Sequence, residues 1–514
     1  MNKILTAICA CSLLALGACK KDFLNTTPSD KVSDANFWKT EKDANAGVSA
    51  IYNDLQNNDI FGLYVYNDGL TPSAYIWDDG GTGMGPITKG NMNPFTSAVV
   101  NKFKALYNGV FRANLALEKL PGISNMSTSV NHRLIAEATF LRALYYYQLT
   151  DFYGDVPLIT KTLPLGAPLL AKETRANLLA FIIKEAGAAA DSLPKSYPAA
   201  QVGHATQGAA LTLKAKAQLL AKQYADAAAT CQTIAGLGYD LYADYRSMFI
   251  STAAENNVEV IFDIQYLAPG LGQGSLLDKR LSTRSSFSSG WSNVYPSVNL
   301  VNNYEMKNGK MITDPSSGYD PANPYNNRDP RLDYTVVRPG ATWKNIPYAN
   351  LRLDNAATFT GYLTRKYVLE VDGFGAGDSP LNFIIFRYAD VLLMLAEAEN
   401  ETAGPDAAVY TAINRVRARK GVDMPPIPAG KSKEEMRDII RHERMIEFAM
   451  EGTYYSDIRR WGIATQLMNG LVVTNIAGQQ IDKINFVDAF NLWPIPQVEI
   501  DLNSNLVQNP NYVK

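Results

Sequence analysis

The sequence predicts a mainly α-helical fold, in which a scaffold of helix pairs carries a long irregular insertion with short strands. Three observations support this prediction. The first part of the chain contains amphipathic runs with helical period, two later segments of similar length each have the pattern of a helix pair, and the stretch between those two segments has little helical period. The 514 residues are enough to bury a large core.

The first predicted helix begins after Thr40. Thr40 is a typical N-cap residue, and Asp43 stands three positions later, as in a capping box. Apolar residues then follow at helical spacing, at Ala44, Val48, Ile51, Tyr52 and Leu55. Similar runs occupy residues 103–122, 132–154 and 173–194, and each of them ends at a glycine or proline.

Two later segments resemble one helix pair that has been repeated. Residues 206–238 contain an alanine-rich helix, a turn near Gln223, a second helix and a glycine stop. Residues 388–421 follow the same plan, with Gly404 and Pro405 as the break. A helix-turn-helix unit of about 34 residues with small residues at the helix contacts is the tetratricopeptide pattern. Two unrelated helical hairpins are the alternative.

The stretch between the two pairs, residues 239–382, is rich in Gly, Ser, Pro, Asn and Asp. It contains strand-like pieces such as VEVIFDIQY (258–266) and RLDYTVV (331–337). Loops this long inside a compact protein are usually functional. We therefore expect one globular unit over residues 19–514, with a helical scaffold at about 40–238 and 383–465 and a loop-rich insertion at about 239–382.

The N-terminus has the pattern of a lipoprotein export signal. Lys3 precedes an apolar run over residues 4–17, which is of signal-peptide length and too short to span a bilayer. The run leads directly into LGAC, a lipobox that ends at Cys19. We expect residues 1–18 to be removed and Cys19 to be acylated, because several acyl chains would hold the protein firmly on a membrane. An ordinary signal peptide cleaved nearby is the alternative.

The composition of the mature chain excludes some functions. Loss of Lys3 leaves 47 of the 48 Lys and Arg residues against 50 Asp and Glu, a net charge of −3. Such a balance provides no electrostatic surface for nucleic acid or anionic lipid. Cys231 is the one cysteine after Cys19, so we expect it to be a small core residue in a fold held by its core rather than by disulfides.

Long motifs along the chain are similar to one known family. They run in order from CKKDFLNTTPSD (19–30) and FWKTEKDANAGVSAIYNDL (37–55) to GWSNVYPSVNLVNNYEMKNGK (290–310), IRHERMIEFAMEGTYYSDIRRWG (440–462) and LWPIPQVEIDLNSNLVQNPNY (492–512). Together they make the chain resemble the SusD/RagB family of lipoproteins of the Bacteroidetes, over essentially its whole length.

The resemblance implies a fold, a location and a partner. The fold would be the SusD-like α/α superhelix with a tetratricopeptide scaffold, and the protein would be lipid-anchored in the cell outer membrane. Family members cap a SusC-like TonB-dependent transporter and hold a nutrient, usually a glycan, for import. The family's surface-export signals favour acidic residues after the lipidated cysteine, whereas this chain has Lys20 and Lys21, which leaves the side of the membrane open.

A glycan site needs exposed aromatic planes beside polar groups, and two loops outside the repeated helices supply both. The predicted ligand-binding residues are Tyr75, Trp77 and Asp78 in AYIWDDGGTG and Trp291, Asn293 and Tyr295 in FSSGWSNVYP. Trp343 is a weaker candidate. Trp38, Trp461 and Trp493 lie in family-wide motifs and are expected to be packing residues. For every loop aromatic, packing within its own loop is the alternative.

No motif predicts an enzyme, a cofactor or a metal site. Glycoside hydrolysis needs two carboxylates about 5 to 9.5 Å apart across a cleft, and the neighbours Asp78 and Asp79 do not suit that geometry. Glu443, Glu447 and Glu451 have helical i, i+4 spacing, but the arginines close to them in sequence, at 441, 444, 459 and 460, favour a structural ion-pair network. The Asp and Asn residues of NPYNNRDP (323–330) could bind calcium, although a turn-rich loop explains the same composition.

Three functions compete on the sequence alone. A non-catalytic glycan receptor that works with a transporter is the preferred hypothesis. The second hypothesis is the same family role with a peptide or another non-glycan nutrient as cargo, since tetratricopeptide scaffolds suit peptides. The third is a hydrolase.

Overall fold

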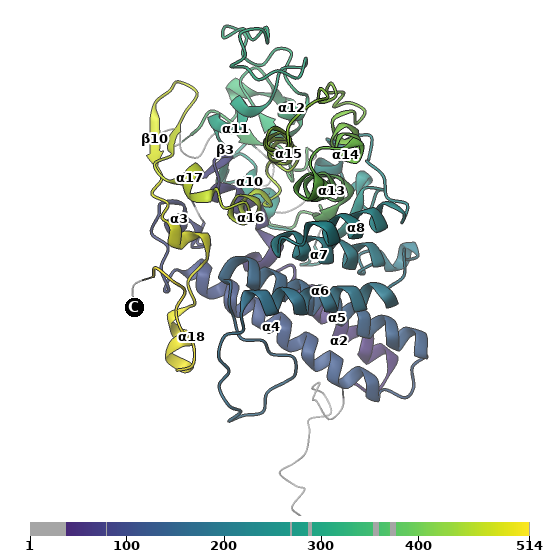
Figure 1. Ribbon diagram of the computed structural model, residues 1–514. Helices are drawn as coiled ribbons and strands as arrows, with labels where there is room; N and C mark the ends of the chain where they lie inside the picture. The colour runs from purple at the N-terminus through teal and green to yellow at the C-terminus, as the bar shows by residue number, and fades with distance from the viewer. Residues whose placement is uncertain are drawn as a thin grey trace, which may run out of the picture.

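The computed structural model describes residues 37–78, 80–267, 270–285, 290–352, 359–370 and 377–512. The predicted signal segment and Cys19 lie outside the described residues. The described part has the predicted mainly α-helical fold, with many helices and a few short strands. Figure 1 shows the helices stacked in chain order from α2 at the bottom to α8 and α13, with the loop-rich part above and beside them.

Each scaffold helix packs on the next one along the chain, so the stack forms a superhelix. Contacts join α2 to α4, α4 to α5, and so on through α8 to α13, which also contacts α14 and α15. The scaffold helices are α2 (Glu41–Asp54), α4 (Ser97–Lys119), α5 (Thr128–Tyr153), α6 (Arg175–Ser192), α7 (Gln207–Leu220), α8 (Tyr224–Ala235), α13 (Tyr388–Ala403), α14 (Ala407–Arg417) and α15 (Lys433–Glu447).

The predicted helix boundaries are confirmed where the sequence carries clear caps. Thr40 caps α2 and exchanges hydrogen bonds with Asp43 in a capping box. The segment 206–238 forms α7 and α8 with the turn at Gln223, and α13 ends at Gly404 before α14 begins.

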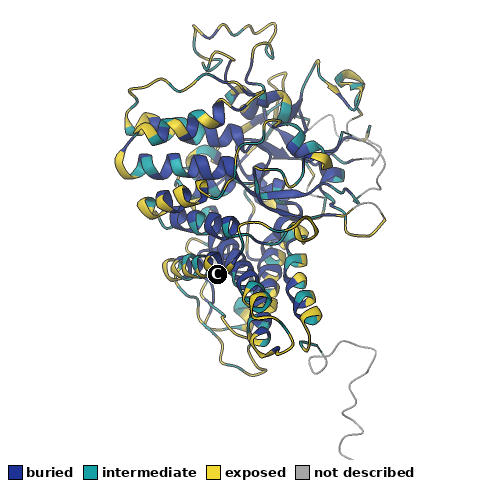
Figure 2. Cartoon of the chain, turned by 90° about the vertical axis from the view of Figure 1, so that its right-hand side faces the viewer, coloured by how far each residue is buried: buried dark blue, intermediate teal, exposed yellow. Residues whose placement is uncertain are grey.

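The helices bury one side and expose the other, as Figure 2 shows for the stack. Helix α5 is the exception, because it lies between α4 and α6 and is buried on all sides from Phe140 to Tyr153. Cys231 is also fully buried, as predicted for a small core residue.

The segment 239–382 contains short elements rather than a continuous sheet. Its helices are α9 (Ser247–Ile250), α10 (Leu277–Leu281), α11 (Val298–Asn303) and α12 (Arg331–Thr335). The strand predicted in VEVIFDIQY is confirmed as β2, whereas most of RLDYTVV is the short helix α12 and only its last two residues are strand. The prediction of a strand over all seven residues was wrong because Asp329 and Pro330 start a helical turn there, in which Leu332 donates to the carbonyl of Asp329.

Every strand among the described residues belongs to a two-stranded sheet. The antiparallel pairs are β1 (Ala74–Ile76) with β3 (Val294–Pro296), β2 (Val260–Ile264) with β8 (Phe383–Arg387), β4 (Val336–Val337) with β7 (Leu363–Thr364), β5 (Thr342–Trp343) with β6 (Ile346–Pro347), and β9 (Val472–Thr474) with β10 (Gln480–Lys483). Two of these pairs, β1–β3 and β2–β8, join the insertion to segments far away in sequence.

The C-terminal segment returns along one side of the molecule to the early helices (Figure 1). It includes α16 (Tyr454–Arg460), α17 (Ala464–Met468) and α18 (Gln497–Leu502), and α3 (Met84–Thr88) lies at the same side. The backbone N–H of Trp493 donates to the carbonyl of Phe152 in α5 at 2.6 Å, and the Trp493 side chain is buried, as predicted for a packing residue. No helix of the described chain combines the length and the apolar character that a membrane crossing requires.

Candidate functional site

The two loops that carry the predicted site lie side by side because β1 pairs with β3. Tyr75 stands opposite Tyr295 in this pair, and Ile76 stands opposite Val294. The pairing continues one residue further, where the backbone N–H of Trp77 donates to the carbonyl of Asn293 at 3.2 Å. Two segments more than 200 residues apart in the sequence are thus held together by main-chain hydrogen bonds.

Trp77 is partly exposed and is fixed in place by two contacts. Its Nε1 donates to the carbonyl of Ser292 at 2.6 Å, and its ring lies nearly parallel to that of Tyr295, with centroids 6.5 Å apart and an interplanar angle of 15°. Tyr295 is supported in turn by Phe359, whose ring meets it edge to face at 5.1 Å. Trp77 is therefore a rigid ring with part of its surface open to solvent.

Trp291 is the second partly exposed ring. Its backbone N–H donates to the carbonyl of Lys279 in α10 at 2.8 Å. The side chains of Lys279 and Arg280 both lie against the Trp291 ring, with Nζ of Lys279 4.3 Å and Cζ of Arg280 4.6 Å from the ring centroid. Cations at these distances are attracted to the electron-rich face of an indole.

Asp78 is exposed beside Trp77. Its carboxylate accepts a hydrogen bond from the backbone N–H of Gly80 at 2.9 Å, which closes a tight turn after β1. Asp79 lies outside the described residues.

The other three predicted ligand-binding residues are buried, and this corrects the prediction that they contact a ligand. Tyr75 is in the core and donates from its hydroxyl to Asp482 of β10 at 3.1 Å. Asn293 and Tyr295 have no exposed surface, and Oδ1 of Asn293 accepts from the hydroxyl of Tyr66 at 3.1 Å. Every residue of β1 and β3 is buried, so Tyr75 and Tyr295 lie in the interior, while the two partly exposed rings stand just beyond the strand ends. Trp343, the weaker candidate, is also buried.

Sequence reasoning missed the contribution of α10 to this site. Lys279 and Arg280 stand in LLDKRL, which has the pattern of an ordinary short amphipathic helix, and no local signal places them against Trp291. The backbone pairing of Asn293 N–H with the carbonyl of Arg280 at 2.7 Å brings α10 to the loop.

Glu443 and Glu447 of α15 and Glu451 just after it form the structural ion-pair network that the sequence predicted, but with other partners. Glu443 contacts Arg331 at 2.6 Å and Arg417 at 2.8 Å, and Glu451 contacts Lys366 at 2.7 Å. The arginines nearest in sequence pair elsewhere, since Arg444 contacts Asp457 and Asp390. All these carboxylates are buried and paired, so none is available for acid or base catalysis.

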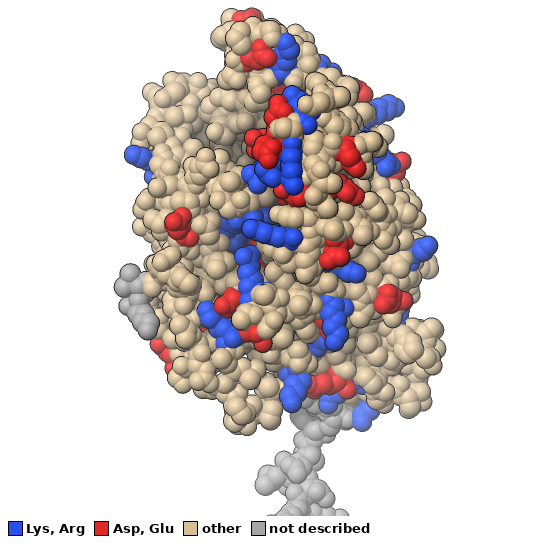
Figure 3. Space-filling model, viewed as in Figure 1, with Lys and Arg blue, Asp and Glu red and all other residues tan. Residues whose placement is uncertain are grey.

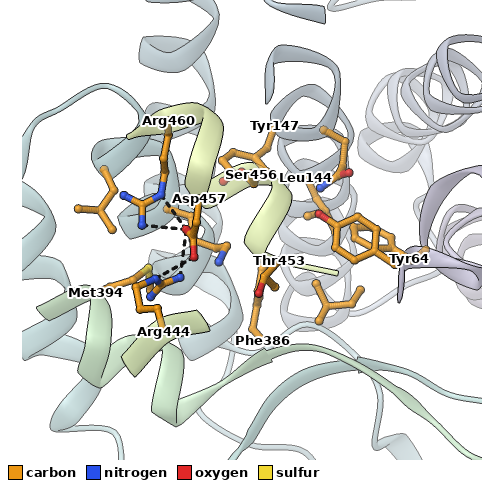
Figure 4. A pocket seen from close by; sticks show the side chains of 15 residues that line it. Tyr64, Leu144, Tyr147, Phe386, Met394, Arg444, Thr453, Ser456, Asp457 and Arg460 are labelled. Carbon is orange, nitrogen blue, oxygen red and sulfur yellow. Dashed lines mark hydrogen bonds and ion pairs between the residues drawn. The ribbon is translucent and has the colours of Figure 1, made fainter. Parts of the chain in front are cut away.

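The network continues around a small cavity between α5, α7, α13 and α16. Figure 4 shows Asp457 held by Arg444 and Arg460 on one side of it, with Tyr64 and Phe386 on the other. The cavity measures about 30 Å³. It would hold one or two water molecules but no sugar ring.

A larger hollow of about 240 Å³ lies between α2 and β2. Tyr52 and His204 line it, and both contact the carboxylate of Glu137, at 2.9 and 2.7 Å respectively. Burial raises the pKa of Asp263, which also lines the hollow, to about 6. The ring of Tyr52 packs edge to face on His204, so its face is not presented as a flat platform for a sugar.

Neither the charges nor the potential metal ligands of the described residues indicate another kind of site. Figure 3 shows acidic and basic side chains interspersed on the viewed face, without a broad area of one sign. Among the described residues, no three His, Cys, Asp or Glu side chains lie close enough together to hold a metal ion. This includes the residues of NPYNNRDP, which form turns.

Comparisons with known proteins match the SusD family along most of the chain. A family model described as the SusD family matches residues 258–512, and one described as starch-binding and associating with the outer membrane matches residues 22–219. A SusD-like protein of Formosa agariphila is 27% identical over 533 residues, which cover 97% of this chain and 98% of that protein.

Solved structures give the same result. A SusD-like carbohydrate-binding protein from Bacteroides fragilis matches with a TM-score of 0.83 and 28% identity, and the match covers 92% of this chain and 100% of the other. Surface glycan-binding protein A from Bacteroides thetaiotaomicron, solved in complex with laminarihexaose, has a TM-score of 0.73 at 20% identity, covering 92% of this chain and 100% of the other, and shows the shared fold. The superhelix, the family models and these relatives together show that the chain belongs to the SusD/RagB family.

Proposed function

We propose that this protein is a non-catalytic lipoprotein of the outer membrane that captures an oligosaccharide or polysaccharide and passes it intact to a SusC-like TonB-dependent transporter. The observation that carries this proposal is the pair of partly exposed tryptophans, Trp77 and Trp291, held on adjoining loops by the β1–β3 pairing. Flat, preorganised rings suit the C–H-rich face of a sugar, because they lose little conformational freedom on binding. Asp78, beside Trp77, adds an acceptor for sugar hydroxyls.

The anchor and the location follow from the N-terminal signal. We assign Cys19 as the lipidated residue, which would hold the protein at the outer membrane. The family model for residues 22–219 is described as associating with the outer membrane, which supports this location. The relative solved with laminarihexaose supports a glycan as the cargo.

Substitution of the two tryptophans tests the glycan site. We expect Trp77→Ala and Trp291→Ala each to weaken retention on a polysaccharide affinity gel by at least about tenfold, equivalent to about 1.4 kcal/mol of binding free energy. Phe111→Ala is the matched control, because Phe111 is an exposed aromatic on α4, away from β1 and β3, and should leave retention unchanged. Circular dichroism checks that each variant remains folded.

Three outcomes would contradict the proposal. Unchanged retention of both tryptophan variants on the gel would reject this glycan site. Binding of oligopeptides with the same affinity by the wild type and both variants would favour a peptide cargo. Release of reducing ends by the purified protein during prolonged incubation with the polysaccharide would reject the non-catalytic role.

The proposed transporter contact has a candidate surface near the C-terminus. Seven of the fifteen exposed large apolar side chains of the described residues lie on segments joined by hydrogen bonds around α18. We call these the apolar patch: Phe95, Leu163, Leu165, Leu169, Val498, Leu502 and Val507. The amide of Asn503 donates to Leu170 and that of Asn505 to Leu169, while the N–H of Gln497 donates to Pro94. Exposed apolar side chains gathered on adjoining segments are a feature of interaction sites, which supports this surface as the contact.

A further inference from the structure

Arg280 is an unusual buried cation. Its side chain is only 8% exposed, and its Nε and Nη1 have no hydrogen-bond partner. Within the described chain, no carboxylate pairs with it. The acidic residue two positions earlier on α10, Asp278, instead accepts the backbone N–H of Leu369 at 2.7 Å.

The three most deeply buried arginines pair with carboxylates, whereas Arg328, which is as buried as Arg280, donates to backbone carbonyls. Arg331, Arg387 and Arg444 each contact at least two carboxylate groups. The contrast with Arg280 matters because a buried charge without a partner costs several kcal/mol. Unsatisfied buried groups in native proteins require an explanation, and a functional site is one.

The position of Arg280 supplies that explanation. Its guanidinium lies between the two tryptophan loops, against the ring of Trp291 on one side and against Gly80 on the other. A Cβ atom built on Gly80 would fall 1.5 Å from Nη1 of Arg280, so a side chain at this position would displace the guanidinium. Gly80 is three residues from Trp77, which places the cation at the edge of the proposed glycan platform.

Among the described residues, two cations contact the partly exposed ring of the Trp291 loop. Lys279 lies against the same ring as Arg280, so two cations share Trp291. Asp78 is the acidic side chain described on the Trp77 loop, and it is exposed and accepts from Gly80 rather than from Arg280. No carboxylate of the described residues therefore pairs with Arg280, and its unsatisfied N–H groups can donate to an anion that comes from outside.

We propose that Arg280 receives an anionic group of the bound glycan, either the carboxylate of a uronic acid or a sulfate ester, while Trp77 and Trp291 contact the neighbouring sugar faces. A guanidinium donates to such groups in a bidentate geometry, and the indole reduces its hydration. This inference rests on the proposed function and narrows its substrate class to acidic glycans.

Calorimetric titration of the mature protein with three hexasaccharides tests the inference. One is a neutral glucan, one a hexuronate and one a sulfated form of the glucan. We expect at least one acidic probe to bind at least about tenfold more tightly than the neutral one at low salt. The affinity of the Arg280→Gln variant for the acidic probe should decrease to its affinity for the neutral probe. Arg112→Gln is the control, because Arg112 is a surface arginine of α4 paired with Asp54.

A stability measurement separates this role from a structural one. Because the Arg280 side chain forms no ion pair with the described residues and contacts the Trp291 ring instead, Arg280→Gln should unfold at about the same denaturant concentration as the wild type, or at a higher one. A marked loss of stability would show that Arg280 is structural and would overturn the inference.

The binding outcomes separate the inference from the function on which it rests. Equal affinity for neutral and acidic probes in the wild type, or a preference that survives in Arg280→Gln, would overturn the inference and leave glycan binding standing. No binding of any probe would count against both the inference and the proposed function. Preference for the hexuronate identifies the carboxylate as the group bound, and preference for the sulfated probe identifies the sulfate ester.

Discussion

Glu447 is a buried carboxylate on which three buried arginines converge. Its carboxylate contacts Arg387 at 2.7 Å and Arg331 and Arg419 at 2.9 Å each. Burial alone would raise the pKa of Glu447. The three arginines lower it by more than burial raises it, so the pKa lies well below its ordinary value. These contacts connect α15 to α12, to β8 and to the turn that follows α14, so the glutamate links the insertion to the scaffold.

We expect Glu447→Gln to destabilise the protein by about 3–5 kcal/mol at pH 7, because it leaves buried guanidinium groups without their counter-charge. Since the folded pKa is lowered, the stabilisation by Glu447 is fully present above the unfolded pKa of about 4.3 and is lost as the pH falls towards the folded pKa. The penalty should therefore shrink by about 1.4 kcal/mol for each pH unit below about 4. Urea unfolding at pH 7 and pH 3 measures both effects.

Glu434→Gln is the control for this experiment, because Glu434 is an exposed residue of the same helix. It should change the free energy of unfolding by no more than about 0.5 kcal/mol at either pH. A Glu447→Gln variant as stable as the control at pH 7 would show that the network contributes nothing to stability.

Single residues also show how far sequence reasoning reaches. The i, i+4 glutamates predicted an ion-pair network, but their partners Arg331 and Arg387 come from more than 50 residues away, and no local pattern can name such partners. The loop positions of Trp77 and Trp291 predict that both are ligand contacts, and both side chains are partly exposed in the structure. Tyr295 belongs to the same sequence stretch as Trp291 but is buried, because it lies in β3, whose residues are covered on both faces, whereas Trp291 lies before the strand.

Among the helices, the contact between α4 and α5 depends on one glycine. A Cβ atom on Gly109 would lie 2.5 Å from the ring of Tyr145, which is fully buried. The hydroxyl of Tyr145 donates to the carbonyl of Ile51 at 2.6 Å, so the ring is held at both ends and cannot easily move away. The two helices approach closely because position 109 has no side chain.

We expect Gly109→Ala to destabilise the protein by about 1–3 kcal/mol, although alanine is the better helix former by about 1 kcal/mol. The overlap with Tyr145 should outweigh the gain in helix propensity. Gly187→Ala on α6 is the matched control, because the nearest atom to its added Cβ is Nζ of Lys214 at 3.9 Å. It should be neutral or stabilising by up to about 1 kcal/mol in the same thermal unfolding experiment. Two variants with equal midpoints would contradict the close-packing argument.

The long helices were predictable because their signals are local. Thr40 with Asp43 marks the start of α2, and Gly404 marks the end of α13, so caps and apolar spacing were enough. The short elements of the insertion were not, as the helix α12 within RLDYTVV shows, because segments of two to five residues take their conformation from distant partners. The β1–β3 pairing that builds the candidate site belongs to this second group.

At the scale of the whole molecule, glycan capture and transporter docking should use different surfaces. The tryptophans lie at β1 and β3, whereas the apolar patch surrounds α18 and the loop before α6. A protein that delivers its cargo to a partner benefits from this separation, because one surface can hold the glycan while the other remains on the transporter. The two activities should then be separable by substitution.

We expect the double variant Leu165→Ser with Leu502→Ser to bind polysaccharide as the wild type does, but to recover at least about fivefold less of a large β-barrel transporter from detergent extracts of the native membrane. Both leucines are highly exposed, at 107% and 70%, so serine removes apolar contact area without opening the core. Val258→Ser, at an exposed valine just before β2, is the control and should leave recovery of the transporter unchanged. If the double variant retained the transporter fully, docking through the apolar patch would be rejected. If the wild type itself never recovered a barrel, the proposed partnership would be rejected, because a partner that receives cargo directly must bind the protein that delivers it.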